Sequence, residues 1–214
     1  MKHILLSITV ALLFSGPVSA QEPATTESKP EDYPRVLVQT NAGDFTLELF
    51  AGRSPITVLN FLTYVDDGFY SGTIFHRVVP GFVAQAGGYD TDYKLKQTRT
   101  KIANESGNGL SNRRAYIAMA RTSNPHSADS QFYVNLADNT ALDPRPTRWG
   151  YTVFGRVVEG MTVIDDIGYR ATGAGPVPQL TRDVPAEQIV ITGMQRIASS
   201  EVAAPAAPAL QPAD

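Results

Sequence analysis

The sequence contains no cysteine among its 214 residues. Disulfide bonds are therefore excluded, and so are thiolate nucleophiles and the cysteine-rich zinc sites that depend on them. Histidine is scarce as well, because only His3, His76 and His126 are present. Since His76 and His126 lie fifty positions apart, a structural zinc site is not expected, and we predict that the protein uses no metal and no cofactor. The hydrophobic core alone has to stabilise the fold.

The motifs of several common enzyme classes are also missing. The sequence has no H-E-x-x-H, no G-x-S-x-G, no P-loop and no complete dinucleotide-binding fingerprint, so the enzyme classes that these motifs mark are not indicated. Charge of one sign is not in large excess, since 18 basic residues stand against 21 acidic ones. A polybasic nucleic-acid-binding protein is therefore not indicated either. With 43% hydrophobic residues, the chain has the composition of a globular protein.

The first twenty residues are typical of a secretory signal peptide. Lys2 and His3 give a short positive start, Ile4–Phe14 is an uncharged apolar run, and Val18–Ala20 offers the small residues of a cleavage site. The run is shorter than the ~18 to 20 apolar residues of a membrane-spanning helix. We therefore favour cleavage after Ala20 over an uncleaved anchor, and we predict an exported, periplasmic protein without stable membrane insertion.

Two further segments have the composition of linkers rather than of a core. Residues 21–34 are polar and contain three prolines, and residues 198–214 form a run rich in alanine and proline without helical or strand periodicity. We interpret the first as a flexible linker and the second as a disordered tail. The folded domain is predicted to span residues 35–197.

Short apolar segments with strand-like alternation dominate this domain, beginning with a hairpin around Asn41–Asp44. The predicted strands are Arg35–Thr40, Phe45–Phe50, Thr73–Val78, Phe82–Ala86, Tyr116–Ala120, Phe132–Asn135, Tyr151–Val157 and Gln188–Ile197. The pattern favours a mainly β fold, a closed eight-stranded antiparallel β-barrel capped by two α-helices. A β-sandwich is the competing architecture.

Two helices are expected, of which the first has clear boundary signals. Ser54 is placed to cap its N-terminus, Pro55 fits its first turn, and Gly68 marks its end. Its apolar face is predicted to consist of Ile56, Leu59, Phe61, Leu62 and Val65. A second, shorter helix is expected around Met161–Ile167.

Three long segments resemble the cyclophilins. They are "FHRVVPGFVAQAGG" at Phe75–Gly88, "AMARTSNPHSADSQFYVNLAD" at Ala118–Asp138 and "YTVFGRVVEGM" at Tyr151–Met161. The resemblance runs in order from about Arg35 to Ile197 and is greatest to the bacterial periplasmic cyclophilins. It implies a cyclophilin-like barrel and an enzyme, a peptidyl-prolyl cis-trans isomerase (rotamase) of class EC 5.2.1.8.

The resemblance also implies a set of site residues. Arg77 matches the catalytic arginine, Phe82 contributes to the proline pocket, and Gln85 steadies the arginine. The expected substrate-binding positions are Val83, Met119, Ala120, Arg121, Thr122, Gln131, Phe132, Tyr133, Leu142 and Tyr151. His76 is expected to be structural, because strand alternation directs it to the face opposite Arg77.

The sequence departs from the best-known eukaryotic cyclophilins around this pocket. Ala141 falls at a tryptophan, Val83 at a methionine, Tyr151 at a histidine and Arg121 at an asparagine. Because the tryptophan is associated with tight cyclosporin binding in the family, we expect weak cyclosporin binding. Trp149 lies nearby in the sequence and is a candidate to fill the gap that Ala141 leaves.

We therefore predict a monomeric isomerase that acts on unfolded or loop-exposed proline-containing polypeptides and assists the folding of exported proteins. Its partners include neither nucleic acid nor a membrane. One alternative is a non-catalytic module that binds proline peptides as a chaperone or adaptor. Another, a carbohydrate-binding barrel, lacks a recognisable aromatic platform.

Overall fold

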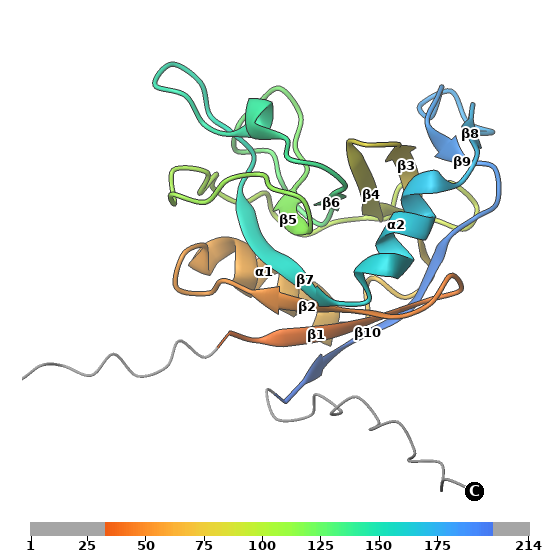
Figure 1. Cartoon of the computed structure of the whole chain (residues 1–214), viewed down its shortest axis with the longest axis horizontal. Coiled ribbons are helices and arrows are strands. Elements are labelled where there is room, and N and C mark those ends of the chain that lie inside the picture. The colour runs from red at the N-terminus through yellow and green to blue at the C-terminus, as the bar shows by residue number, and fades with distance from the viewer. Residues whose placement is uncertain (1–32, 199–214) are drawn as a thin grey trace, which may run out of the picture. The chain divides into compact units, whose positions relative to one another are not determined.

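Eight strands pair side by side until the sheet closes on itself (Figure 1). The computed structural model describes residues 33–198, and these form the protein discussed below. The barrel strands are β1 (Arg35–Thr40), β2 (Phe45–Leu49), β3 (Thr73–Val79), β4 (Val83–Asp90), β5 (Tyr116–Met119), β6 (Phe132–Asn135), β7 (Val153–Glu159) and β10 (Val190–Ile197). Their order around the barrel is β1-β10-β3-β4-β6-β5-β7-β2, and every pair is antiparallel.

The predicted barrel is thus confirmed, and the sandwich alternative is wrong. The two helices are also confirmed, as α1 (Pro55–Asp66), which packs against β10, and α2 (Met161–Tyr169), which packs against β2, β3 and β4. Three short elements were not expected, the 3-10 turn η1 (Thr140–Leu142) and the strands β8 (Thr172–Gly173) and β9 (Val184–Pro185), which pair with each other. Elements of two or three residues are too short to leave a periodic pattern in the sequence.

The buried face of α1 differs from the predicted one. Phe61, Leu62 and Val65 are buried as expected, but Ile56 and Leu59 are 46% and 68% exposed. Thr57, Val58 and Tyr64 complete the buried face instead. The helix is rotated because Phe61 lies at the centre of an aromatic cluster, with ring centroids 5.2 to 5.5 Å from Tyr70, Phe132 and Phe154. Packing against the barrel interior, and not the spacing of apolar residues alone, therefore determines which face of α1 is buried.

The N-terminus of α1 is capped by a residue distant in the sequence. Ser54 occupies the cap position, but its Oγ donates to the carbonyl of Val153 (2.9 Å) and makes no capping hydrogen bond. The carboxylate of Glu105 accepts instead from the backbone N–H groups of Ile56 (3.1 Å) and Thr57 (2.8 Å). A carboxylate also suits the positive end of the helix dipole. The capping role predicted for Ser54 is wrong, and the side chain joins the helix start to β7.

Alternation along β4, β5, β6 and β7 creates two apolar clusters on opposite faces of one sheet. The inward set belongs to the barrel core and includes Ala84, Ala86, Ile117, Met119, Phe132, Val134 and Phe154. The outward set consists of Val83, Ala118, Tyr133 and Val153. Neighbours in sequence, such as Phe132 and Tyr133, therefore serve different faces. The outward cluster is the floor on which the site described below is built.

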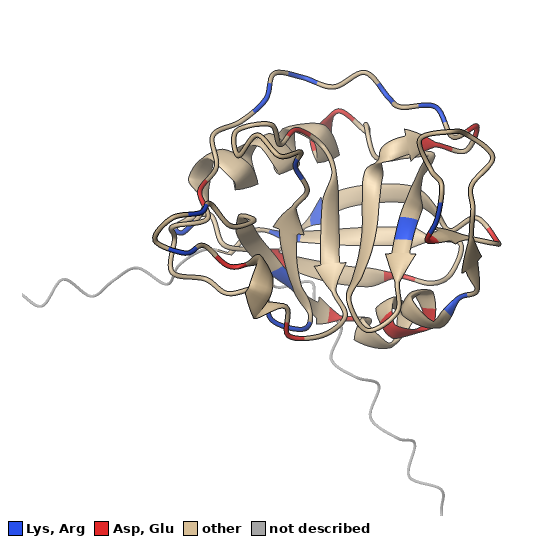
Figure 2. Cartoon of the chain, turned by 90° about the horizontal axis from the view of Figure 1, so that it is seen from above, with Lys and Arg blue, Asp and Glu red and all other residues tan. Residues whose placement is uncertain are grey.

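Charged residues lie mostly in loops and near strand ends. Figure 2 shows Lys and Arg interspersed with Asp and Glu over the described residues, in keeping with the balanced composition. Within residues 33–198, no helix combines the length and hydrophobicity needed to cross a membrane. The predicted signal peptide, linker and tail fall wholly or almost wholly outside the described residues and stay predictions.

The long-range cap on α1 leads to a stability prediction. Replacing Glu105 with alanine leaves two backbone donors of the first turn unpaired, so we expect the free energy of unfolding to fall by about 1 to 2 kcal/mol. Urea denaturation measures this change. Glu187→Ala, at an exposed carboxylate paired with Arg170, is the control and should change stability by less than about 0.5 kcal/mol. Equal effects of the two substitutions would contradict the assigned cap.

Candidate active site

A hollow of about 270 Å³ opens above the outward apolar cluster. It is lined by Arg77, Phe82, Val83, Gln85, Ala120, Arg121, Tyr133, Leu142 and Tyr151. We call it the Arg77 hollow. All nine residues belong to the set predicted from the sequence, although they come from six separate parts of the chain. Strand pairing explains part of this convergence, because Arg77 lies opposite Gln85, and Gln85 lies opposite Tyr133.

Four other predicted site residues lie elsewhere. Thr122 and Gln131 line an adjoining hollow of about 280 Å³, which shares Gln85, Ala120 and Arg121 with the first. Met119 and Phe132 are 2% and 0% exposed and face the barrel interior. The expectation that these two side chains contact a ligand is therefore not met. Met119 and Phe132 are adjacent in the sequence to the outward residues Ala118 and Tyr133. Successive residues of a strand face opposite sides of the sheet, so a shift of one position changes the face.

Arg77 lies at the edge of the apolar hollow with about a third of its side chain exposed. Its Nη1 donates to Oε1 of Gln85 (3.4 Å), and its guanidinium carbon is 5.9 Å from the centre of the Phe82 ring. Gln85 in turn donates through Nε2 to Oε1 of Gln131 (3.0 Å). The arginine is thus oriented by a chain of two amides. Most of its five N–H donors remain available to a ligand in the hollow.

Gly88, the last residue of the motif "VAQAGG", leaves the space that this chain of amides needs. A Cβ atom at Gly88 would lie 2.5 Å from Cδ of Gln131. Any larger residue at position 88 would push the Gln131 amide away from Gln85. The sequence carried a signal for this close approach, namely a glycine within a strand.

A carboxylate missed by the sequence analysis lies on the other side of Arg77. Oδ2 of Asp183 is 3.7 Å from Nε of Arg77, and the Asp183 carbonyl accepts from the backbone N–H of Val78 (2.7 Å). Asp183 has a positive φ of 64°, a region that aspartate tolerates better than most residues. Asp183 lies more than one hundred positions after Arg77, so no local pattern links the two residues.

Tyr133 forms part of the floor of the hollow, and its hydroxyl is held by a hydrogen bond to a buried side chain. The hydroxyl donates to Oδ1 of Asn112 (2.8 Å), whose backbone N–H donates to Oδ1 of Asp143 (2.7 Å). Burial raises the pKa of the Tyr133 hydroxyl well above 10, so the group stays neutral. These bonds fix the ring and connect the floor to the loop that carries Leu142. Neither Asn112 nor Asp143 was singled out from the sequence.

His76 does not lie on the face opposite Arg77 as predicted. The pairing of β3 with β4 is irregular between Phe75 and Arg77, and this bulge disturbs the alternation. As a result, His76 and Arg77 line the same polar hollow of about 300 Å³, next to Gln131 and Asp183. His76 itself is only 3% exposed. Burial, together with the charge of Arg77, lowers the pKa of the imidazole to about 4.

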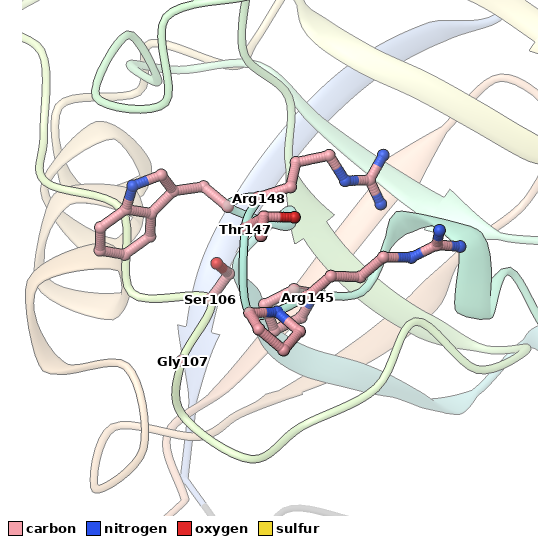
Figure 3. A pocket seen from close by; sticks show the side chains of 8 residues that line it. Ser106, Gly107, Arg145, Thr147 and Arg148 are labelled. Atoms are coloured by element: carbon pink, nitrogen blue, oxygen red, sulfur yellow. The ribbon is translucent and has the colours of Figure 1, made fainter.

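A further hollow of about 410 Å³ lies under the loop before β7 (Figure 3). It is lined by Ser106, Gly107 and the loop residues Pro144, Arg145, Pro146, Thr147, Arg148 and Trp149. We call it the loop hollow. Trp149 is 47% exposed and meets the His126 ring edge-on at 5.3 Å, and it does not line the Arg77 hollow. The idea that Trp149 fills the gap beside Ala141 is therefore wrong.

Among residues 33–198, no three His, Asp or Glu side chains are grouped closely enough to hold a metal ion. The Arg77 hollow contains no carboxylate or histidine within its lining. What the arrangement offers is a fixed cation beside an apolar surface, with amide groups along one rim.

Comparison with known proteins identifies the family. The family model for cyclophilin type peptidyl-prolyl cis-trans isomerase/CLD matches residues 35–196, which is almost the whole described chain. The chain belongs to the cyclophilins. The resemblance inferred from the sequence and the isomerase class that it implied are confirmed by this membership.

Bacterial cyclophilins are among the similar proteins. The chain is 44% identical over 191 residues to peptidyl-prolyl cis-trans isomerase A of Dickeya dadantii, covering 89% of this chain and 95% of that protein. It is 46% identical to peptidyl-prolyl cis-trans isomerase B of Escherichia coli, covering 73% and 95% of the two chains. A crystal structure of a cyclophilin type isomerase from Cryptosporidium parvum has a TM-score of 0.63 at 23% identity, covering 78% of this chain and 98% of that one, and thus supports the cyclophilin fold.

The lowered pKa of His76 predicts a dependence of stability on pH. Because the folded value is about 4 and the ordinary value is 6.5, the unfolded chain binds more protons at this residue between these limits. The stability that the neutral His76 side chain contributes is therefore fully present above pH 6.5 and is lost as the pH falls towards 4. Between pH 7 and 4.5, we expect this residue to contribute a loss of roughly 2 to 3 kcal/mol.

Urea unfolding of the wild type and His76→Gln at both pH values measures this contribution. The variant should lose less stability on acidification than the wild type, whatever its stability at pH 7. Parallel changes in the two proteins would show that His76 does not carry the effect.

Proposed function

We propose that this protein catalyses cis-trans isomerisation of X-Pro peptide bonds in unfolded or loop-exposed polypeptides and so assists the folding of exported proteins. The observation that carries the proposal is the Arg77 guanidinium, held by Gln85 and Asp183 at the edge of an apolar hollow. Membership of the cyclophilin family supports the reaction. The predicted signal peptide supports a periplasmic place of action.

The reaction requires rotation about an amide and no bond cleavage. Partial double-bond character gives this rotation a barrier of about 18 to 20 kcal/mol. When the amide is twisted, resonance is lost and the prolyl nitrogen becomes a pyramidal hydrogen-bond acceptor. A donor aimed at that nitrogen therefore stabilises the transition state and not the planar ground state.

Arg77 is suited to this role, since its guanidinium is charged at every working pH and its orientation is restrained. One charge-assisted hydrogen bond contributes about 1.5 to 3 kcal/mol. A 10⁴-fold acceleration needs about 5.4 kcal/mol, so the arginine accounts for only part of it. The rest is assigned to the apolar walls, which hold the proline ring and exclude water from the twisted amide. Phe82, Val83, Tyr133 and Leu142 provide these walls.

The hollow of about 270 Å³ is large enough to hold a proline ring. A Cryptosporidium parvum cyclophilin of the same fold was crystallised in the presence of the dipeptide Ala-Pro. Ala-Pro is therefore a suitable first probe of binding to the Arg77 hollow in this protein.

A non-catalytic role remains the second candidate function. The same walls could hold a proline peptide as part of a chaperone or adaptor without accelerating its rotation. The restrained Arg77 favours the enzyme, because binding of a planar proline segment does not require a donor beside the prolyl nitrogen.

The central prediction concerns Arg77. Arg77→Ala should lower kcat/KM for a proline tetrapeptide at least tenfold, with most of the loss in kcat, because the lost hydrogen bond forms only in the transition state. A protease-coupled assay or NMR exchange spectroscopy measures the rate. Arg196→Ala is a suitable control, since Arg196 pairs with Asp66 in a different part of the molecule.

Each outcome of this experiment separates the candidates. Wild-type activity in Arg77→Ala would contradict the arginine mechanism. An inactive wild-type protein that still binds Ala-Pro would favour the non-catalytic module.

Cyclosporin binding is predicted to be weak. Ala141 is exposed and too small to form a rim, and Trp149 is directed elsewhere. We expect a dissociation constant of one micromolar or more in isothermal titration calorimetry, together with normal isomerase activity. Submicromolar binding would show that the tryptophan is not required.

A further inference from the structure

Arg121 is held rigidly at the rim of the Arg77 hollow. Its Nε donates to the carbonyl of Gly150 (3.2 Å), its Nη1 to that of Thr122 (2.9 Å) and its Nη2 to that of Trp149 (2.9 Å). The guanidinium also lies over the Tyr151 ring, 4.5 Å from its centre. Three of its five N–H donors are thus used within the chain, and two remain for a ligand. The position of this charge is therefore fixed before any peptide arrives.

The charges around the hollow are of one sign. Arg77 and Arg121 are the only charged residues among the nine that line it, and both are cationic. Of the carboxylates that line the neighbouring hollows, Asp129 pairs with Lys101, and Asp183 is shared between Arg77 and Arg182. Among the described residues, no carboxylate pairs with Arg121, so a peptide side chain at this rim meets its positive charge.

The rim position of Arg121 places it next to the residues that flank a bound proline. Arg121 lines both the Arg77 hollow and the adjoining hollow with Thr122 and Gln131. Consecutive residues of an extended peptide are about 3.3 to 3.8 Å apart, so a proline in the first hollow brings its neighbour to the rim between the two. A charged side chain on that neighbour is within Coulomb range of the guanidinium.

We propose that Arg121 makes this site select X-Pro segments by charge, so that an acidic residue directly before the proline is favoured over a basic one. This inference rests on the proposed function and specifies its substrate class. Arg77 interacts with the rotating amide itself, whereas Arg121 acts on the side chain beside it. For unit charges about 6 Å apart in a largely aqueous environment, the expected preference is roughly three- to tenfold.

The test compares two tetrapeptides that differ only before the proline, Ala-Glu-Pro-Phe and Ala-Lys-Pro-Phe. For the wild-type protein at low ionic strength, kcat/KM should be roughly three- to tenfold higher for the glutamate peptide. The ratio should approach one at about 0.5 M salt, because the pair is partly exposed and is screened. NMR exchange spectroscopy measures both rates without a coupling protease that has its own charge preference.

Three variants separate charge from loop structure. Arg121→Gln should bring the ratio close to one, and Arg121→Lys should keep most of the preference, because it keeps the charge without the planar fork. Arg148→Gln is the matched control. Arg148 also binds carbonyls of this loop, those of Ala141 (2.6 Å) and Asp143 (3.3 Å), but it lies at the loop hollow (Figure 3) and should leave the ratio unchanged.

The fluorescence of Trp149, the only tryptophan, reports whether the loop has moved in each variant. Equal kcat/KM for the two peptides with the wild type would overturn the inference while leaving the isomerase function intact. So would an effect of Arg148→Gln as large as that of Arg121→Gln. If the wild type accelerates neither peptide, the proposed reaction is rejected, and the ratio of the two dissociation constants tests the charge preference instead.

Discussion

The site depends on one constraint, the placement of neighbouring side chains of the strands β4, β5, β6 and β7 on opposite faces of the sheet. Each of these strands contributes adjacent residues to the two faces, so the same few segments supply the core and the floor of the Arg77 hollow. Phe132 packs against Phe61 in the interior, while Tyr133 faces the hollow. The floor is rigid because its strands also carry the closely packed core, which allows little movement. A ligand meets a surface that the folding of the barrel has already fixed.

Two arginines lie beside this apolar floor, and their guanidinium groups are held by different contacts. Arg77 has long contacts to Gln85 (3.4 Å) and Asp183 (3.7 Å), which orient it and leave most of its donors unused. Arg121 instead donates three hydrogen bonds to backbone carbonyls, and its guanidinium lies over the Tyr151 ring. The first arrangement suits a donor whose partner appears only during the reaction. The second suits a fixed charge that shapes the field around the bound segment.

The sequence was sufficient to predict the barrel from its strand pattern, and the resemblance to the cyclophilins was sufficient to predict most residues of the Arg77 hollow. It failed where the answer depends on contacts between distant segments. Glu105 caps α1 from the far side of a long loop, and Asp183 reaches Arg77 only after the chain has completed most of the barrel. Met119 and Phe132 were assigned to the wrong face by one residue, an error that a pattern of closely spaced apolar residues does not reveal. The bulge at His76 defeated the alternation argument itself, because it places the adjacent residues His76 and Arg77 on the same side of β3.

Closure of the sheet removes the two outer strands that an open sheet would have. An open sheet presents unpaired backbone N–H and C=O groups at its two outer strands, and an extended polypeptide can add to such an edge. In the barrel described here, every strand has a neighbour on both sides, from β1 around to β2. An extended polypeptide therefore finds no outer strand of the barrel to join. The barrel thus presents the Arg77 hollow without also presenting an outer strand at which extended chains pair edge to edge.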